Sequence, residues 1–338
     1  MNVKTPSTSN PQFFKPSNLQ FFNPSNLQIP YLCPVKPNVK AHIYVLAANI
    51  IYGINYSVGK VALKEMSPLA IVAFRVCCAF LVFFAAHQIF IKENVDRADH
   101  KKFILASLFG VAVNQMLFFT GLSLTSEMHA SLIMITTPLL VLIMAWVILR
   151  DPITITKSIG ILSGAAGVAL LIISGTVADN STASAFGDLC IFINATSYAI
   201  FLVIAKPLMK KYAPLTLAKW IFFYGMFMVI PFGFNDLQQL SFGEISTQAW
   251  LALSVVVFGA TVLAYLFNIL GLRYGSPALV SIYIYTQPII ATMVALMLGT
   301  DSLTLPKVIS AILVFAGVAL VSRSSIAIPA AEPEAKLK

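Results

Sequence analysis

Ten apolar runs of about twenty residues follow one another along the chain, separated only by short connections. They cover approximately residues 42–63, 68–91, 102–123, 127–149, 155–174, 186–207, 214–234, 248–272, 276–298 and 304–322. A helix of this length crosses the roughly 30 Å hydrocarbon core of a bilayer. The runs lack the alternation of apolar and polar residues that marks the strands of a membrane barrel. The sequence therefore predicts an all-α polytopic membrane protein with ten transmembrane helices.

The composition agrees with residence in lipid rather than in water. Hydrophobic residues make up 58% of the 338 residues and charged residues only 10%, whereas soluble domains carry about 25% charged residues. The 22 Lys and Arg exceed the 13 Asp and Glu, which gives a net charge of +9. A basic chain can bind nucleic acid, but such proteins gather their charges on a polar face. Polar faces are scarce here, so we expect no nucleic-acid partner.

The basic residues are unevenly distributed among the predicted loops. The N-terminal tail, the even-numbered loops and the C-terminal tail carry most of the 22 Lys and Arg. The odd-numbered loops carry only Lys60, Lys64 and Lys307. Because positively charged loops stay in the cytoplasm, both termini are predicted to be cytoplasmic, as an even number of spans also requires. The expected location is the plasma (inner) membrane of a bacterial cell.

The two ends of the chain differ from the apolar body. Residues 1–40 are rich in Pro, Asn, Ser and Phe, and residues 12–19 repeat almost unchanged as residues 20–27. Regularly spaced prolines prevent a continuous helix, and the segment has no apolar core of the kind that signal peptides carry. We expect a disordered N-terminal tail over residues 1–40 and a cytoplasmic C-terminal tail over residues 325–338.

The body contains an internal repeat. The sequence from Gly121 matches the sequence from Gly271 at a shift of 150 positions, and the first two runs match at a shift of 146. The matched pairs include Tyr52 and Tyr198, Lys60 and Lys206, Thr136 and Thr286, Pro138 and Pro288, and residues 166–170 with 316–320. Each unit holds five spans, an odd number, so the second must enter from the opposite side of the bilayer. We predict two inverted five-helix repeats, over residues 41–175 and 185–324.

The doubled order of Gly-Leu, Thr-x-Pro, an acidic residue and Gly-Val-Ala-Leu resembles the EamA domain of the drug/metabolite transporter superfamily. Arg75 matches the Phe-Arg that this family usually has in its second span. The family usually has Leu-Gly-Glu after the fourth and ninth spans, where this chain has Leu149-Arg150-Asp151 and Gly299-Thr300-Asp301. The resemblance implies ten helices, cytoplasmic termini, and export or exchange of small metabolites, without naming a substrate.

Inverted repeats are typical of secondary transporters, which bind their solute near the midplane between the two halves. The sequence has no HExxH, GxSxG or nucleotide-binding motif, so we expect no enzyme. ATP-driven transport would require a separate ATPase subunit, and we expect no such partner. It also has no CxxC or CxxH spacing, so we expect no metal and no cofactor.

The predicted function is secondary transport, outward, of a small polar or amphipathic metabolite such as an amino acid by alternating access. The expected partners are that solute and the lipid bilayer, and the protein is expected to be a monomer or a homodimer. Two alternatives stay open. One is an exchanger of nucleotide sugars or sugar phosphates, and the other is a membrane scaffold that transports nothing.

Polar side chains near the middle of the runs are the candidates for solute binding, because they are costly in hydrocarbon unless they face protein or water. The predicted binding residues are Asn55, Arg75, Asn114, Gln115, Asn194, Tyr198, Tyr265, Asn268, Tyr283 and Gln287. Their alternative role is hydrogen bonding between helices. For Arg75, the alternatives are an anionic group of the solute and an ion pair with Glu127.

Pro138 and Pro288 lie centrally in matched spans of the two halves. A proline removes a backbone donor and kinks its helix, and broken helices at corresponding positions point to a transport site. We predict that both prolines flank the central cavity. Gly160, Gly164 and Gly167 form a stripe of small residues that predicts close packing against another helix.

Overall fold

The computed structural model describes residues 39–91, 93–125, 127–175, 184–241, 243–297 and 304–324. The two predicted tails lie outside these residues, except that Val39 and Lys40 are the first residues of a helix. Asp301, which belongs to the second departure from the family pattern, also lies outside. Every regular element among the described residues is helical, which confirms the all-α prediction.

The helices of the first half begin with α1 (Val39–Leu63) and α2 (Pro68–Phe90). The third segment is a continuous stretch of four pieces: η2 (Arg97–Asp99), α3 (His100–Ser107), the π-helical η3 (Leu108–Ala112) and α4 (Val113–Leu124). The fourth is split into α5 (Glu127–Met134) and α6 (Thr137–Leu149), and the fifth is α7 (Ile155–Gly175).

The second half repeats this order with the same irregularities. It begins with α8 (Ala185–Lys211) and α9 (Pro214–Gln238), and its third segment joins α10 (Thr247–Ser254), the π-helical η4 (Val255–Leu263) and α11 (Ala264–Tyr274). The fourth is again broken, into α12 (Pro277–Ile282), η5 (Tyr283–Tyr285) and α13 (Thr286–Met297), and α14 (Leu305–Ser324) is the fifth. The internal repeat is therefore visible in the backbone as well as in the sequence.

Five helical segments in the described part of the chain are long and apolar enough to cross a membrane. They are Pro68–Phe90, Arg97–Leu124, Ala185–Lys211, Pro214–Gln238 and Thr247–Tyr274. Shorter apolar helices include Thr137–Leu149 and Pro277–Ile290. Many large apolar side chains on the outer faces of these helices are exposed, as expected for surfaces that contact lipid rather than water.

Serine and proline fix where several helices begin. The Ser67 hydroxyl accepts a hydrogen bond from the Ala70 amide at 3.2 Å, and Ser246 and Ser276 cap α10 and α12 in the same way. Pro68 follows Ser67 at the first position of its helix, where the missing amide hydrogen costs nothing. These caps satisfy backbone donors that would otherwise be exposed at the helix ends.

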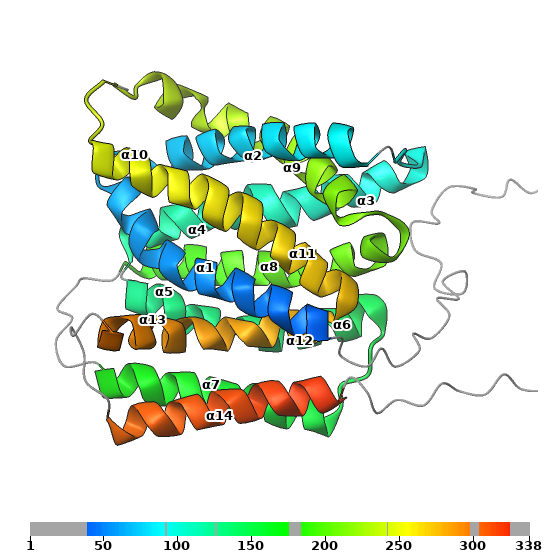
Figure 1. Ribbon diagram of the computed structural model, residues 1–338, viewed down its shortest axis with the longest axis vertical. Helices are drawn as coiled ribbons and strands as arrows, with labels where there is room; N and C mark the ends of the chain where they lie inside the picture. The colour runs from blue at the N-terminus through cyan, green and yellow to red at the C-terminus, as the bar shows by residue number, and fades with distance from the viewer. Residues whose placement is uncertain are drawn as a thin grey trace, which may run out of the picture. The chain divides into compact units, whose positions relative to one another are not determined.

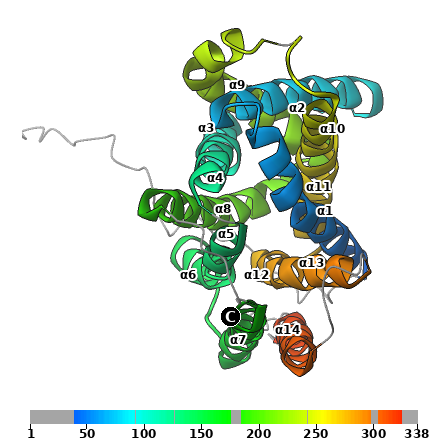
Figure 2. The same cartoon turned by 90° about the vertical axis from the view of Figure 1, so that its left-hand side faces the viewer.

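The first half packs against the second through pairs of corresponding helices. α2 packs along α9, and α7 packs along α14 at the bottom of both views (Figures 1 and 2). Two further close pairs are reciprocal, since α4 contacts α8 while α1 contacts α11. Each of these two pairs joins the third segment of one half to the first segment of the other, as expected if a two-fold axis relates the halves.

Glycines allow α7 and α14 to approach closely, as predicted from the stripe of small residues. A Cβ atom placed on Gly317 of α14 would lie 2.5 Å from the backbone oxygen of Gly160 in α7. A Cβ atom on Gly160 would in turn lie 2.9 Å from the oxygen of Gly317, and one on Gly164 would lie 2.3 Å from the ring of Tyr285. Because backbone atoms are the obstacles at the first two positions, neighbouring side chains cannot relieve the clash.

We expect Gly317→Ala to lower the free energy of unfolding by about 1–3 kcal/mol, because the added methyl group overfills a backbone contact. The matched control is Gly243→Ala, since a Cβ atom there meets no atom within 4 Å. Thermal unfolding of both variants in detergent measures the difference. Equal unfolding midpoints for the two variants would show that α7 and α14 can separate without cost.

Arg150 occupies a backbone position that suits glycine. It ends α6 with φ 56° and ψ 27°, in the left-handed region, and no other non-glycine residue among those described has a positive φ. Glycine adopts this conformation without strain, which gives a physical reason for the glycine that the family usually has here. The neighbouring Asp151 forms an ion pair with Lys157 at 3.0 Å, which ties this turn to the start of α7.

Candidate functional site

A cavity of about 90 Å³, lined by amide, aromatic and apolar side chains and by one arginine, lies between the two halves. This is room for several water molecules or a small solute. The first half contributes Tyr52, Asn55, Tyr56, Arg75, Asn114, Gln115, Phe118 and Met134, and the second contributes Asn194, Tyr198, Ala260, Tyr265, Ile284 and Gln287. Because both halves form its walls, any relative movement of the halves changes the cavity.

The structure brings eight of the ten predicted binding residues to the wall of this cavity. They are Asn55, Arg75, Asn114, Gln115, Asn194, Tyr198, Tyr265 and Gln287. Asn268 lies behind the wall and donates a hydrogen bond to the Tyr198 hydroxyl. Tyr283 is engaged elsewhere, since its hydroxyl lies 2.6 Å from Nδ1 of His42.

The aromatic residues Tyr52, Tyr56 and Phe118 line the cavity but were not among the predicted binding residues. Tyr52 corresponds to Tyr198 in the internal repeat. That match was the one signal in the sequence that could have placed Tyr52 at the site. The rings of Tyr56 and Phe118 lie 5.5 Å apart in an edge-on arrangement, so they form one aromatic wall.

Both predicted proline sites coincide with breaks in a helix. The turn at residues 135–136 separates α5 from α6 just before Pro138, and η5 separates α12 from α13 just before Pro288. Pro288 lines a smaller hollow that shares Tyr56 and Gln287 with the main cavity. Pro138 is buried inside the bundle but does not line either hollow.

Arg75 on α2 is a buried cation in this wall, with only 6% of its surface exposed. Its Nε donates a hydrogen bond to the Thr261 hydroxyl at 2.7 Å, and its guanidinium carbon lies 4.9 Å from the centre of the Phe119 ring. Among the described side chains, no carboxylate lies within ion-pair distance of it; the side chain of Glu127 is not among them. A buried charge without a counter-ion is unstable, so this position favours an anionic group.

The two π-helical segments support the wall from corresponding places. π-helical turns interrupt regular bonding and occur often at functional sites. In η3, the backbone oxygen of Gly110 accepts from the Tyr265 hydroxyl at 3.2 Å, and that of Phe109 accepts from Ser197 at 2.7 Å. In η4, the Thr261 hydroxyl donates to the backbone oxygen of Val256 at 2.8 Å and accepts from Arg75. Irregular backbone therefore orients both a tyrosine and the arginine.

Three amide oxygens in the wall have no hydrogen-bond partner among the described residues: Oδ1 of Asn55, Oε1 of Gln115 and Oδ1 of Asn194. The orientation of Asn194 is fixed because its Nδ2 donates to the backbone oxygen of Asn114 at 2.7 Å. Buried polar atoms are nearly always satisfied in proteins, by protein or by bound molecules. Each of these buried oxygens therefore lacks the hydrogen-bond donor that a bound molecule would supply.

Comparison with known proteins matches two long segments of the chain, residues 39–173 and 185–323, to the EamA-like transporter family. The chain belongs to this family. This EamA-like transporter is 27% identical over 284 residues to the uncharacterized transporter YyaM of Bacillus subtilis, covering 83% of this chain and 93% of that protein. It is 26% identical over 282 residues to an uncharacterized transporter of Archaeoglobus fulgidus, covering 82% and 98%.

A crystal structure of another protein has the same fold, with a TM-score of 0.66, 17% identity, and coverage of 85% of this chain and 98% of that one. The resemblance found in the sequence is thus confirmed, and this EamA-like transporter is a multi-pass membrane protein. Its cavity combines one cation, three free acceptors and aromatic walls. That combination can bind a small molecule that carries an anionic group and hydrogen-bond donors at once.

Proposed function

We propose that this EamA-like transporter is a secondary transporter that exports amino acids or closely related small metabolites. The observation that carries the proposal is the presence of Arg75 and three unpartnered amide oxygens in one cavity. The carboxylate of an amino acid would pair with the Arg75 guanidinium. Its ammonium group has three donors, which match the acceptor oxygens of Asn55, Gln115 and Asn194.

The proposed mechanism is alternating access between two inverted five-helix halves, residues 41–175 and 185–324, with ten spans in all. Reciprocal packing of corresponding helices supports this arrangement, because related halves can exchange their conformations. The charge distribution among the loops supports cytoplasmic termini in a bacterial plasma membrane. The solute and the lipid are the proposed partners, for a monomer or a homodimer.

Exchange of nucleotide sugars or sugar phosphates is the less favoured function. A phosphate group carries up to two negative charges and would call for several cations in the wall. Arg75 is the one cationic side chain among the described residues that line the cavity. Lys219 lies outside the cavity, with its Nζ 3.5 Å from Nδ1 of His87 and 4.9 Å from the centre of the Trp220 ring. A membrane scaffold that transports nothing, the other alternative, would not need a cavity with an arginine and several amides in its wall.

Proteoliposomes containing the full chain test the proposal by competition, with and without a pH gradient. We expect labelled amino acids to cross, and an intact amino acid to compete at least about tenfold better than analogues of the same skeleton that lack the amine or the carboxylate. Equal competition by the analogue without the amine would contradict the role of the amide oxygens. Flux of sugar phosphates without flux of any amino acid would favour the alternative.

The matched variants are Gln115→Leu, which removes one free acceptor, and Gln248→Leu, which changes an exposed glutamine on α10. We expect about tenfold weaker binding of the amino acid for Gln115→Leu, because its ammonium group loses a hydrogen bond in a buried site. We expect no change for Gln248→Leu. Competition by the analogue without the amine should be the same in both variants.

A further inference from the structure

Two sets of polar contacts join the halves at opposite ends of the α2–α9 pair. One set, the charged clasp, consists of Asp96 and Asp99 before α3, with Lys211 and Tyr212 at the end of α8. The other set, the serine clasp, consists of Glu65 and Ser67 before α2, with Asp236 near the end of α9 and Ser246 at the start of α10. Because α2 follows the serine clasp and precedes the charged clasp, its whole length lies between them.

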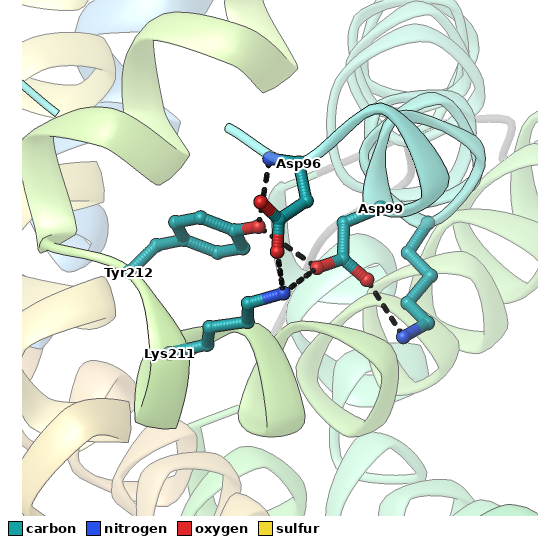
Figure 3. Close-up of polar contacts among 5 residues, drawn as sticks. Asp96, Asp99, Lys211 and Tyr212 are labelled. Carbon is teal, nitrogen blue, oxygen red and sulfur yellow. Dashed lines mark hydrogen bonds and ion pairs between the residues drawn. The ribbon is translucent and has the colours of Figure 1, made fainter. Parts of the chain in front are cut away.

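The charged clasp joins Lys211 to two aspartates, one of which, Asp99, also pairs with Lys102 at 2.8 Å (Figure 3). Nζ of Lys211 lies 2.6 Å from Oδ2 of Asp99 and also contacts Asp96. The hydroxyl of Tyr212 donates to Asp99 at 2.8 Å and accepts from the backbone amide of Asp96 at 3.2 Å. The Asp99 side chain is only 8% exposed, so water screens its charge less than it screens an exposed pair.

A further carboxylate strengthens the same end. Glu93, between α2 and α3, accepts hydrogen bonds from the backbone amide of Ala213 at 2.9 Å and from the Thr216 hydroxyl. Ala213 and Thr216 lie at the start of α9. The loop of the first half between α2 and α3 is therefore attached to the junction of α8 and α9 by ion pairs and by hydrogen bonds from the backbone.

The serine clasp holds the other end with neutral donors. Ser246 donates to Glu65 twice, from its hydroxyl at 2.6 Å and from its backbone amide at 2.7 Å. The Ser67 hydroxyl donates to Asp236 at 2.6 Å. The hydrogen bond from the Ser246 hydroxyl, followed by that from its amide, holds the pKa of Glu65 below its ordinary value. This carboxylate is therefore ionised at neutral pH, yet it is held here by hydrogen bonds rather than by an ion pair.

The two clasps occupy equivalent places in the internal repeat. Glu65 corresponds to Lys211 at the shift of 146, and Asp96 and Ser246 each stand directly before the third helical segment of their half, at η2 and α10. The same two positions of the repeat therefore connect the halves at both ends. The two connections differ in chemistry, since the charged clasp contains ion pairs and the serine clasp consists of hydrogen bonds from serine to carboxylates.

We propose that the two clasps determine which end of the cavity opens, with the charged clasp closing its end more firmly than the serine clasp closes the other. The cavity lies between the halves, so a solute can leave only where the halves separate at one end. Opening either end breaks the clasp there. The role of the clasps rests on the proposed alternating access, and the loop charges put the charged clasp on the predicted cytoplasmic side.

Accessibility of a cysteine in the cavity tests this proposal. The reporter is Ala260→Cys, a buried position in the wall, in a chain whose native cysteines are replaced by alanine. A membrane-impermeant thiol reagent is applied from either side of vesicles of defined orientation. We expect Lys211→Met to raise the ratio of labelling from the charged-clasp side to labelling from the opposite side about three- to tenfold, because exposed ion pairs contribute modestly. Asp96→Asn, which removes only the more exposed pair, should raise it less.

The matched control is Lys210→Met, since Lys210 is exposed, adjacent and outside both clasps. For the other end, Glu65→Ala should lower the same ratio, and Glu244→Ala, at an exposed acid nearby, should not. The double variant that combines Lys211→Met with Glu65→Ala should have a labelling ratio close to that of the unmodified chain. A general loss of packing would raise labelling from both sides and would not produce these opposite shifts.

The labelling results distinguish a failure of the clasp proposal from a failure of the proposed function, because labelling requires no knowledge of the solute. If the reporter is labelled from both sides but Lys211→Met and Lys210→Met give the same ratio, the proposal for the clasps is overturned. If every variant is labelled from one side only, access does not alternate, and the proposed function fails along with the role of the clasps.

Discussion

Arg75→Met is expected to lower amino-acid flux about thirtyfold or more, because truncating one partner of a buried charge pair costs at least about 2 kcal/mol. The guanidinium is buried in the cavity wall and is held in place by Thr261 and Phe119. No carboxylate among the described side chains pairs with it, and in the proposed function the solute supplies the negative charge that it favours. Flux into proteoliposomes at saturating and limiting solute measures the loss.

Stability separates this role from a structural one. Replacing a buried cation by an apolar side chain of similar size is often neutral or stabilising, so Arg75→Met should unfold no earlier than the unmodified chain. Arg75→Lys keeps the charge but loses the planar fork that matches a carboxylate, and should retain part of the flux. Arg273→Met, at an exposed arginine, is the control. A lower unfolding midpoint with normal flux in Arg75→Met would show that Arg75 serves the fold.

The sequence alone predicted those residues of the candidate cavity whose polar side chains, in the middle of apolar segments, had to face protein rather than lipid. Asn55, Gln115 and Asn194 lie in the middle of apolar segments, and the cost of an amide in hydrocarbon directs each of them inward. The breaks before Pro138 and Pro288 follow from the same kind of local chemistry, since proline cannot donate to the preceding turn. These features depend on one residue and its helix, so no tertiary information was needed.

Contacts between distant segments could not be predicted in this way. Tyr283 lies in the same apolar run as Gln287, but its hydroxyl bonds with His42, a residue far away in the sequence. Asn268 is also buried, yet it does not line the cavity and instead donates a hydrogen bond to Tyr198, which does. Hydrophobic periodicity places a side chain on a face of its helix, but the depth at which that face meets another helix depends on the packing of both.

Some basic residues have a second role, which the count of Lys and Arg in each predicted loop did not reveal. Lys211 contributes to the positive side that orients the chain, and the structure also places it in the charged clasp with Asp96 and Asp99. Lys60 and Lys206 are matched in the internal repeat, and each caps the end of a helix in its own half. Nζ of Lys60 donates to the backbone oxygen of Thr125 at 2.7 Å, just after α4.

Lys206→Met is expected to lower the free energy of unfolding by about 3 kcal/mol, since hydrogen bonds to charged groups contribute about 1.5–3 kcal/mol and buried acceptors left unpaired are costly. Nζ of Lys206 donates to the backbone oxygens of Leu272 at 2.8 Å and Gly275 at 2.5 Å, with Arg273 at 3.4 Å. Lys206 is 8% exposed. Its cation also compensates the negative end of the α11 dipole.

The repeat supplies a graded comparison for Lys206→Met. Lys60→Met removes a cation that is less buried and donates to a single acceptor among the described residues, the backbone oxygen of Thr125, so it should cost about half as much. Lys210→Met, at an exposed lysine next to the charged clasp, should change stability little. In detergent, the loss of unfolding free energy should therefore be largest for Lys206→Met, smaller for Lys60→Met and smallest for Lys210→Met. If Lys206→Met and Lys210→Met unfold at the same midpoint, the hydrogen bonds of Lys206 to the end of α11 contribute nothing to stability, and the burial of Lys206 has another cause.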